Sequence, residues 1–279
     1  MIDLHTHSTV SDGHGSPAQV MREAAAAGVD TVALTDHDQI IGWDEAAAEA
    51  AQVGVSLVRG AEISTLTDGV SVHLLGYLFR PAESALLEFL EGTREARLNR
   101  ARKMADLLSR DFPVDWELVQ AQAGEGTTLG RPHLADALVA AGVVASRDEA
   151  FATILNPSNK YYVRHAAPAT ALAVRAVIEA GGVPVLAHPF AVQRGRTLDE
   201  AAIERLHAVG LMGLEAYHRD HTPQQVEQLR GIARRLGLLV TGSSDYHGTG
   251  KPNRLGEHYT SPEVLAEIAD RGALPILRP

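Results

Sequence analysis

The stretch LHTHSTVSDG, residues 4–13, places two histidines one residue apart at the end of an expected strand over residues 2–5. Because side chains alternate along a strand, His5 and His7 point to the same face and lie close together. Two imidazoles crowded on one face suit a metal site better than an apolar core. Asp12 follows in Ser-Asp-Gly, which is also typical of a tight turn.

Outward from this stretch, strand-like and helix-like segments alternate along most of the chain. Strands are expected over residues 2–5, 31–36, 57–64, 70–79, 183–188, 211–217 and 238–245. Helices are expected over residues 17–27, 44–52, 169–180, 198–209, 223–236 and 262–270. This alternation predicts parallel strands with helices packed outside them, in an α/β barrel that is closed or nearly closed. The expected fold is a distorted (β/α) barrel of about seven strands.

The pattern changes between residues 84 and 165. A long charged amphipathic helix is expected over residues 86–108, and the shorter helical pieces HLADALVAAG (133–142) and SRDEAFATIL (146–155) follow without strands. We interpret residues 85–165 as a helical insertion after the fourth strand, acting as a lid or substrate domain. Residues 1–84 and 166–279 would then form the barrel.

Composition narrows the class of protein. The chain has 279 residues and a formal net charge of −10, which disfavours long nucleic acid and phospholipid as partners. No apolar run approaches the ~20 residues of a membrane span, and no secretory signal is recognisable. The chain has no cysteine, which excludes thiolate metal ligands and fits a reducing cytoplasm. An anionic substrate would need local positive charge, which bound divalent metals supply.

Polar residues of the metal-ligating types recur at the expected strand ends. They are His5, His7, Asp36, His37, Glu62, His73, His188, Glu215, His218, Asp245 and His247. In a βα barrel these ends meet at one face. A lone histidine such as His73 is more often a hydrogen-bonded core residue than a metal ligand. The prediction of a metal site therefore rests on the gathering of all these residues at one face. Imidazole and carboxylate without thiolate suit Zn, Mn or Fe better than calcium.

Seven motifs together resemble those of PHP-domain (polymerase and histidinol phosphatase) proteins. In order they are HTHSTVSDG, LTDHD, GAEIS, HLLGY, AHPF, EAYHRDHT and SSDYHG. GRPHLADAL and EAYHRDHT are more similar to the stand-alone bacterial branch, which contains nucleoside 3′,5′-bisphosphate phosphatases, AMP-type phosphatases and the 5′-to-3′ exoribonuclease called RNase AM. The resemblance implies a PHP-type barrel that binds two or three divalent metal ions, with Mn²⁺ expected and Zn²⁺ or Fe²⁺ left open.

The family pattern implies a ligand set for each metal. The first ion would be bound by His5, His7, Glu62 and Asp245. Glu62 would bridge to a second ion held by His73 and His188, and the third would be bound by Asp12, His37 and His247. A metal-bridging hydroxide would attack the phosphate. Glu62, Asp245 and His218 are the expected catalytic residues, with His218 a candidate proton donor to the leaving group.

A second set of residues is expected to bind the substrate. Arg131 and His133 begin a predicted helix in the insertion, where an anion is favoured, and Lys160 lies near the return to the barrel. With His218 at the rim, these residues would grip a second phosphate or a ribose. The alternative is that Arg131 only starts a helix and Lys160 is a solvated loop charge.

The expected activity is hydrolysis of phosphate monoesters of nucleotides, above all the 3′-phosphate of nucleoside 3′,5′-bisphosphates or the phosphate of AMP-like nucleotides. Three alternatives stay open: a 5′-to-3′ exoribonuclease acting on short 5′-phosphorylated RNA, a histidinol phosphatase, and a non-catalytic nucleotide- or metal-binding regulator. A metal-dependent C–N hydrolase is disfavoured because the expected barrel strands carry no lysine. The oligomeric state is left open.

Overall fold

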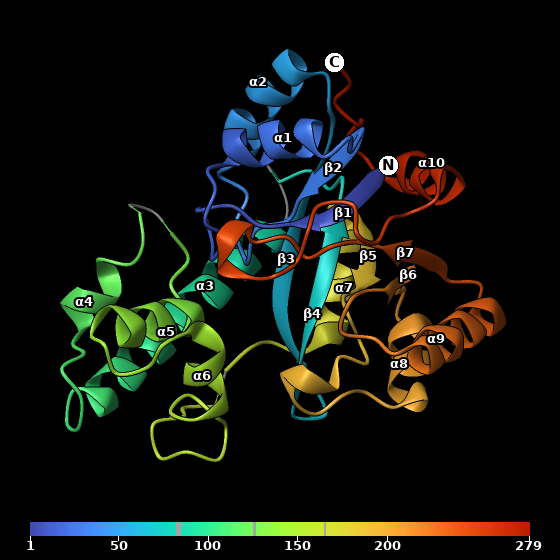
Figure 1. Ribbon diagram of the computed structural model, residues 1–279. Coiled ribbons are helices and arrows are strands. Elements are labelled where there is room, and N and C mark those ends of the chain that lie inside the picture. The colour runs from blue at the N-terminus through green and yellow to red at the C-terminus, as the bar shows by residue number, and fades with distance from the viewer. Residues whose placement is uncertain (82–84, 125–126, 165) are drawn as a thin grey trace.

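Seven strands form one sheet in chain order in the computed structural model, which describes residues 1–81, 85–124, 127–164 and 166–279 (Figure 1). The strands are β1 (Ile2–Thr6), β2 (Thr31–Leu34), β3 (Ser56–Thr67), β4 (Val70–Tyr77), β5 (Val183–Leu186), β6 (Gly213–Tyr217) and β7 (Leu239–Gly242). The sheet curls until its edges meet, where His7 N donates to Tyr246 O at 2.8 Å. The prediction of an α/β fold with a nearly closed seven-stranded barrel is therefore confirmed.

The prediction of parallel strands is wrong for β4. This strand runs antiparallel to both β3 and β5. The cause is a two-residue turn at Asp68 and Gly69, whose φ angles of 52° and 73° give a tight hairpin. Parallel neighbours would need a long crossover connection, which this turn does not provide. Because β4 runs backwards, its first half lies beside the second half of β3, and His73 pairs with Ser64.

The barrel strands are covered on the outside by helices. These are α1 (Pro17–Ala26), α2 (Trp43–Val53), α7 (Thr170–Glu179), α8 (Glu200–Ala208), α9 (Pro223–Leu236) and α10 (Pro262–Arg271). Ser16, Thr222 and Ser261 cap α1, α9 and α10 with their hydroxyls, and a proline follows each cap. The buried sides of these helices pack on the sheet, as Met21 of α1 does in the same core as Leu57 of β3.

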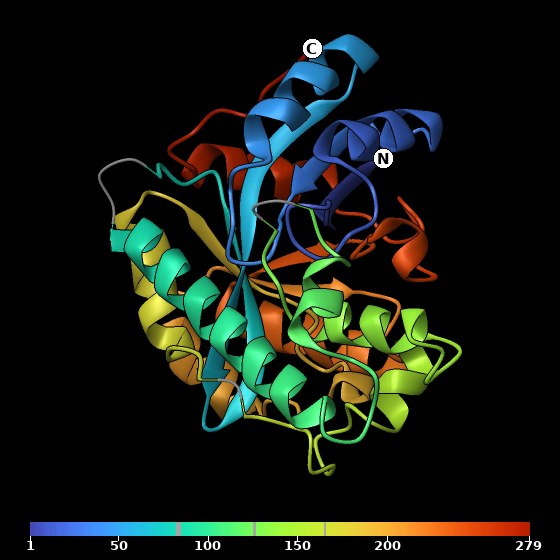
Figure 2. The ribbon, with the colours of Figure 1, turned by 90° about the vertical axis from the view of Figure 1, so that its left-hand side faces the viewer.

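The insertion follows β4 and has an apolar core of its own. It contains α3 (Ala85–Leu108), α4 (Trp116–Gln120), α5 (Arg131–Ala140) and α6 (Arg147–Ala152). Its core includes Met104, Leu108, Leu134, Leu138 and Leu155. Figure 2 shows α3 running along the side of the barrel, with the shorter helices beside it. The short helix α4 was not predicted.

The predicted domain boundaries at 84 and 165 lie outside the described residues, so the division at 85–165 stays a prediction. The longest helix, α3, has 24 residues and many charges. Among the helices of the described ranges, none has the length and apolar character that a membrane crossing requires.

Candidate metal centre

The nine predicted ligands all lie at one end of the barrel. Eight of them are buried, and His73 is partly exposed. They are carried by strands or by the loops that follow them: His5, His7, Asp12, His37, Glu62, His73, His188, Asp245 and His247. The backward course of β4 does not separate His73 from the others, because its first half lies at this end of the sheet.

Glu62 stands at the centre of the group, and its two carboxylate oxygens face different imidazoles. Oε2 lies within 3.2 Å of a ring nitrogen of each of His5, His7 and His37. Oε1 lies 2.7 Å from His73 Nδ1 and 3.1 Å from His188 Nε2. A carboxylate with its oxygens divided in this way has the geometry of a bridging ligand.

Two aspartates complete the group on either side of Glu62. Asp245 Oδ1 lies 3.2 Å from His7 Nε2 and 3.5 Å from His5 Nε2. Asp12 Oδ1 lies 3.2 Å from His247 Nε2.

Three sets of ligand atoms, each within 4.8 Å of one another, can be drawn among the described residues. They are His5, His7, Glu62 and Asp245; His7, Asp12 and His247; and His37, Glu62 and His73. The first is the set that the family pattern implies. In the other two sets His37 groups with Glu62 and His73, while its second ring nitrogen, Nε2, lies 3.8 Å from Asp12 Oδ2.

The chemistry of these atoms fits divalent metal ions. Within the described ranges, four buried ring nitrogens of the nine ligands have no hydrogen-bond partner: His5 Nε2, His7 Nε2, His37 Nδ1 and His247 Nε2. A buried polar atom without a partner is costly, and four together at carboxylate oxygens indicate a ligand that they share. Nitrogen and oxygen donors without sulfur are typical of sites for Mn, Fe or Zn.

The buried charges of the cluster stabilise one another in the absence of metal. Burial lowers the pKa of His7, but Asp245 and Glu62 outweigh it and raise that pKa to about 9. Burial raises the pKa of Glu62, but imidazoles led by His73 and His37 hold it well below its usual range. Because a metal binds neutral imidazole, loading the site would displace protons from the histidines whose pKa is raised.

Carboxylates behind the cluster orient its members. Glu215 Oε1 lies 3.0 Å from His5 Nδ1, and Oε2 accepts a hydrogen bond from the backbone N–H of His188 at 2.8 Å. Asp36 accepts from Ser8 N at 2.8 Å and from Ser11 Oγ at 2.6 Å, and so fixes the loop that carries Asp12. Partners of this kind set the ring orientation of metal-ligating histidines.

Two of the nine residues have a strained backbone. His188 has a φ of 28° and Asp245 a φ of 54°, values that non-glycine residues rarely adopt. Both follow the end of a strand, where the surrounding hydrogen bonds hold them. Strain of this kind concentrates at functional sites, because the required side-chain direction outweighs its cost.

His218 lies beside the cluster in a defined tautomer. Its Nδ1 accepts a hydrogen bond from Asp220 N at 3.0 Å, so the neutral ring carries its proton on Nε2. That Nε2 is buried, has no hydrogen-bond partner among the described residues, and lies 3.7 Å from Asp245 Oδ2. The arrangement directs an N–H toward the cluster.

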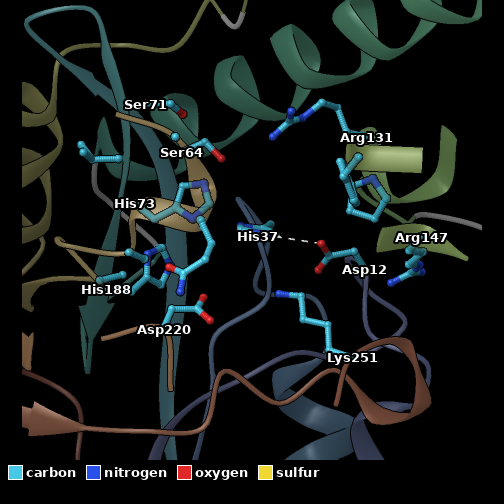
Figure 3. Close-up of a pocket in the computed structure, with 18 of the residues that line it drawn as sticks. Asp12, His37, Ser64, Ser71, His73, Arg131, Arg147, His188, Asp220 and Lys251 are labelled. Atoms are coloured by element: carbon cyan, nitrogen blue, oxygen red, sulfur yellow. Dashed lines mark ion pairs between the residues drawn. The ribbon is translucent and has the colours of Figure 1, made fainter. Parts of the chain in front are cut away.

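A pocket of ≈ 620 Å³ opens over the cluster, between the barrel and the insertion (Figure 3). Asp12, His37, His73 and His188 line its barrel side. The insertion contributes arginines to the facing wall: Arg97, Arg100, Arg131 and Arg147.

The predicted substrate-binding residues of the insertion divide into one that lines the pocket and two that do not. Arg131 lies in the pocket wall. His133 is buried, and its Nδ1 accepts a hydrogen bond from Gly130 N at 3.1 Å at the start of α5. Lys160 is 68% exposed and pairs with Asp111 at 2.8 Å. Neither His133 nor Lys160 is among the residues lining this pocket.

The arginine wall carries positive charge that is only partly balanced. Arg97 donates to Ser64 Oγ at 2.7 Å and lies 3.6 Å from Asp38 Oδ2. In the described part of the chain, no carboxylate lies within ion-pair distance of Arg100 or Arg131. Burial and the charge of Arg131 lower the pKa of Arg100 to about 10.

Aromatic rings support this wall, since the Arg131 guanidinium lies 5.3 Å from the ring centre of Phe151 and 5.7 Å from that of Tyr162. Sequence reasoning missed Arg97 and Arg100. Their spacing of three residues on an expected helix, which places them on the same face, is the signal that could have found them.

The chain is similar to known proteins along its whole length. The PHP domain model matches residues 3–124. A 3′,5′-nucleoside bisphosphate phosphatase of Chromobacterium violaceum is 35% identical, with 100% of this chain and 98% of that protein covered. A 5′-3′ exoribonuclease of Haemophilus influenzae is 32% identical over 88% of this chain and 89% of its own.

Structural comparison agrees with these relatives. A Bifidobacterium adolescentis protein described as a metal-dependent phosphoesterase superposes with a TM-score of 0.95 and 44% identity, over 98% of this chain and 96% of its own. The chain therefore belongs to the PHP-domain family. With its His, Asp and Glu cluster, it is a metal-dependent phosphoesterase.

Proposed function

We propose that this enzyme removes the 3′-phosphate of nucleoside 3′,5′-bisphosphates and also hydrolyses AMP-like nucleotides. The observation that carries the proposal is a single pocket with the metal-ligating cluster on one wall and arginines on the facing wall. A substrate with two phosphates would satisfy both walls. The full-length similarity to a bisphosphate phosphatase supports this choice.

The nine clustered residues would hold two or three divalent ions, Mn²⁺ by preference. Such ions, when bound, polarise the phosphate oxygens and lower the pKa of water for in-line attack. Glu62 would hold two ions at once, since its oxygens face separate imidazoles. Glu215 would keep His5 in the orientation and tautomer that leave Nε2 free to bind.

His218 is proposed to donate a hydrogen bond from Nε2 to the leaving oxygen, which takes its proton from water. Its Nε2 carries the proton because Nδ1 is already an acceptor, and this atom lies beside Asp245 at the edge of the cluster. A hydrogen-bond donor held within reach of the departing oxygen stabilises the charge that develops on it during P–O cleavage. Glu62 and Asp245 would act at the same centre as ligands.

Arg131 and Arg100 are proposed to bind the second phosphate. A guanidinium offers several N–H donors in a planar fork that matches phosphate oxygens. Both side chains are half-buried, so water screens their charge less than it would on an open surface. Roles of His133 and Lys160 in substrate binding stay predictions.

The second candidate function is a 5′-to-3′ exoribonuclease on short 5′-phosphorylated RNA. The H. influenzae relative, whose name carries that activity, favours it. The net charge of −10 is unsuited to long nucleic acid, but an enzyme that removes one nucleotide at a time needs little binding surface.

The test is phosphate release by the Mn²⁺-loaded enzyme from adenosine 3′,5′-bisphosphate, AMP, histidinol phosphate and a short 5′-phosphorylated RNA, with His5→Ala as the control. Fast release from the bisphosphate that is lost in the control supports the proposal. Release of mononucleotides from the RNA at a higher rate would move the assignment to exoribonuclease. Preference for histidinol phosphate, or no turnover with metal bound, would overturn it.

A further inference from the structure

The loop over residues 247–253, HGTGKPN, follows β7 and is held in place at several points. Asn253 is buried and donates from Nδ2 to Ser244 O at 2.6 Å. His14 joins the loop through Thr249, with Nδ1 and Oγ1 2.9 Å apart, and Arg147 of the insertion lies 2.9 Å from His14 Nε2. The loop therefore connects the barrel to the insertion at the rim of the pocket.

Gly250 shows how closely this loop packs. A Cβ there would lie 2.8 Å from Arg147 Nη1 and 3.0 Å from His14 Nε2. The absence of a side chain at Gly250 lets the loop pass beneath these groups. As a result the next residue, Lys251, lines the pocket.

Lys251 stands at the edge of the metal-ligating cluster. Its Nζ lies 3.2 Å from Asp245 Oδ2, whereas the other oxygen, Oδ1, lies 3.2 Å from His7 Nε2. One carboxylate thus faces the histidines with one oxygen and the lysine with the other. Figure 3 shows the Lys251 side chain reaching into the pocket toward His37 and Asp12.

The choice of residue is informative because lysine is rare in this chain. Lysine occurs only at positions 103, 160 and 251, and of these Lys251 alone lines the pocket. An ammonium group is a compact charge with three N–H donors, and lysine is a common phosphate ligand in this role. Asp245 accounts for one donor, which leaves others for a bound anion.

We propose that Lys251 binds the phosphate group that is cleaved, next to the metal ions. The inference rests on the proposed phosphatase function and deepens it. The insertion arginines would contact the phosphate that stays on the product, and Lys251 would contact the one that leaves. A substrate with one phosphate would still need Lys251 but would make little use of Arg131.

The experiment compares Lys251→Met and Lys251→Arg with the Mn²⁺-loaded wild type, and uses Lys103→Met on the exposed surface of α3 as the matched control. Three quantities are measured: metal per chain, affinity for inorganic phosphate by titration calorimetry, and kcat/KM on AMP and on adenosine 3′,5′-bisphosphate. Circular dichroism establishes that each variant is folded.

With Lys251→Met we expect unchanged metal content, weaker phosphate binding, and kcat/KM reduced about 10- to 100-fold on both substrates alike. Lys251→Arg should retain part of the activity, and Lys103→Met all of it. Wild-type affinity for phosphate in Lys251→Met would overturn the proposal. A loss of metal that accounts for the lost activity would also overturn it, by making Lys251 only a partner of Asp245.

Failure of the proposed function would look different. A wild-type enzyme that releases no phosphate from nucleotides, but binds inorganic phosphate in a Lys251-dependent way, would leave this inference standing. A wild type that binds no phosphate at all would overturn both.

Discussion

The two walls of the pocket are built on different principles. The barrel wall consists of strand-end residues that are almost all buried, with imidazoles and carboxylates balancing one another around Glu62. The insertion wall consists of helix-borne arginines over aromatic rings, and two of them have no carboxylate partner in the described ranges. The barrel wall is therefore suited to bind metal ions, and the insertion wall is suited to bind an anionic group of the substrate.

One fold can thus place the reaction and the choice of substrate on separate structural elements. The barrel wall depends on backbone pairing between strands, which fixes the ligands closely. The insertion has its own core, so its surface could change without disturbing the ligands. Buried hydrogen bonds join the two, such as Arg97 to Ser64 at 2.7 Å and Thr128 N to Val10 O at 2.9 Å.

The largest expected effect comes from the barrel wall. Glu62→Gln keeps the shape of the side chain but removes the charge that both sets of imidazoles face. We expect phosphate release from every substrate to fall on the order of 10³-fold or more, together with metal content. Steady-state rates and metal analysis would measure both, with Glu91→Gln on the exposed side of α3 as control. A variant that kept its metal and its rate would contradict the central position of Glu62.

The insertion wall should respond more selectively. Arg131→Ala removes a half-buried side chain whose guanidinium lines the pocket but lies in none of the ligand sets. We expect KM for adenosine 3′,5′-bisphosphate to rise about 10- to 100-fold and KM for AMP to rise much less, because charged hydrogen bonds to a second phosphate are lost. Arg102→Ala, which removes a guanidinium 5.5 Å from the Trp116 ring, is the matched control. Equal effects on the two substrates would contradict the assignment of the second phosphate to the insertion wall.

The barrel wall could be predicted from sequence because its residues occupy a repeated position, the strand end. Asp12 and His247 are 235 positions apart, yet barrel geometry alone brings their loops together. The direction of β4 was missed although Asp68 and Gly69 form a typical hairpin turn. The alternation of strands and helices suggested a parallel β4, but the turn between β3 and β4 is too short for the crossover that parallel strands need.

The insertion wall could not be read in the same way. Arg97 and Arg100 belong to a long charged helix, where a charge is most simply explained by solvent exposure. Their burial depends on how α3 docks against the barrel and on Tyr162, far along the chain, whose ring centre lies 5.1 Å from the Arg100 guanidinium. Lys251 was missed for a related reason, because only the path of its loop brings it to Asp245.

The stability of the metal-free protein should change least, and it tests whether the charges of the barrel wall balance one another. Asp245 and Glu62 overcome the effect of burial and raise the pKa of His7 to about 9. A histidine in the unfolded chain has a pKa of about 6.5. Because the folded pKa is the higher one, this stabilisation is complete below pH ~6.5 and is lost as the pH rises through ~9.

We therefore expect Tm of the metal-stripped protein to fall on the order of 5 °C between pH 6.5 and 9.5. The Mn²⁺-loaded protein should not show this fall, because its ligating imidazoles are already neutral. Scanning calorimetry with and without chelator measures both curves, and His7→Gln should flatten the metal-free one. A metal-free Tm that stays constant or rises over this range would mean that the carboxylates do not hold a proton on His7, and that the barrel wall is balanced in another way.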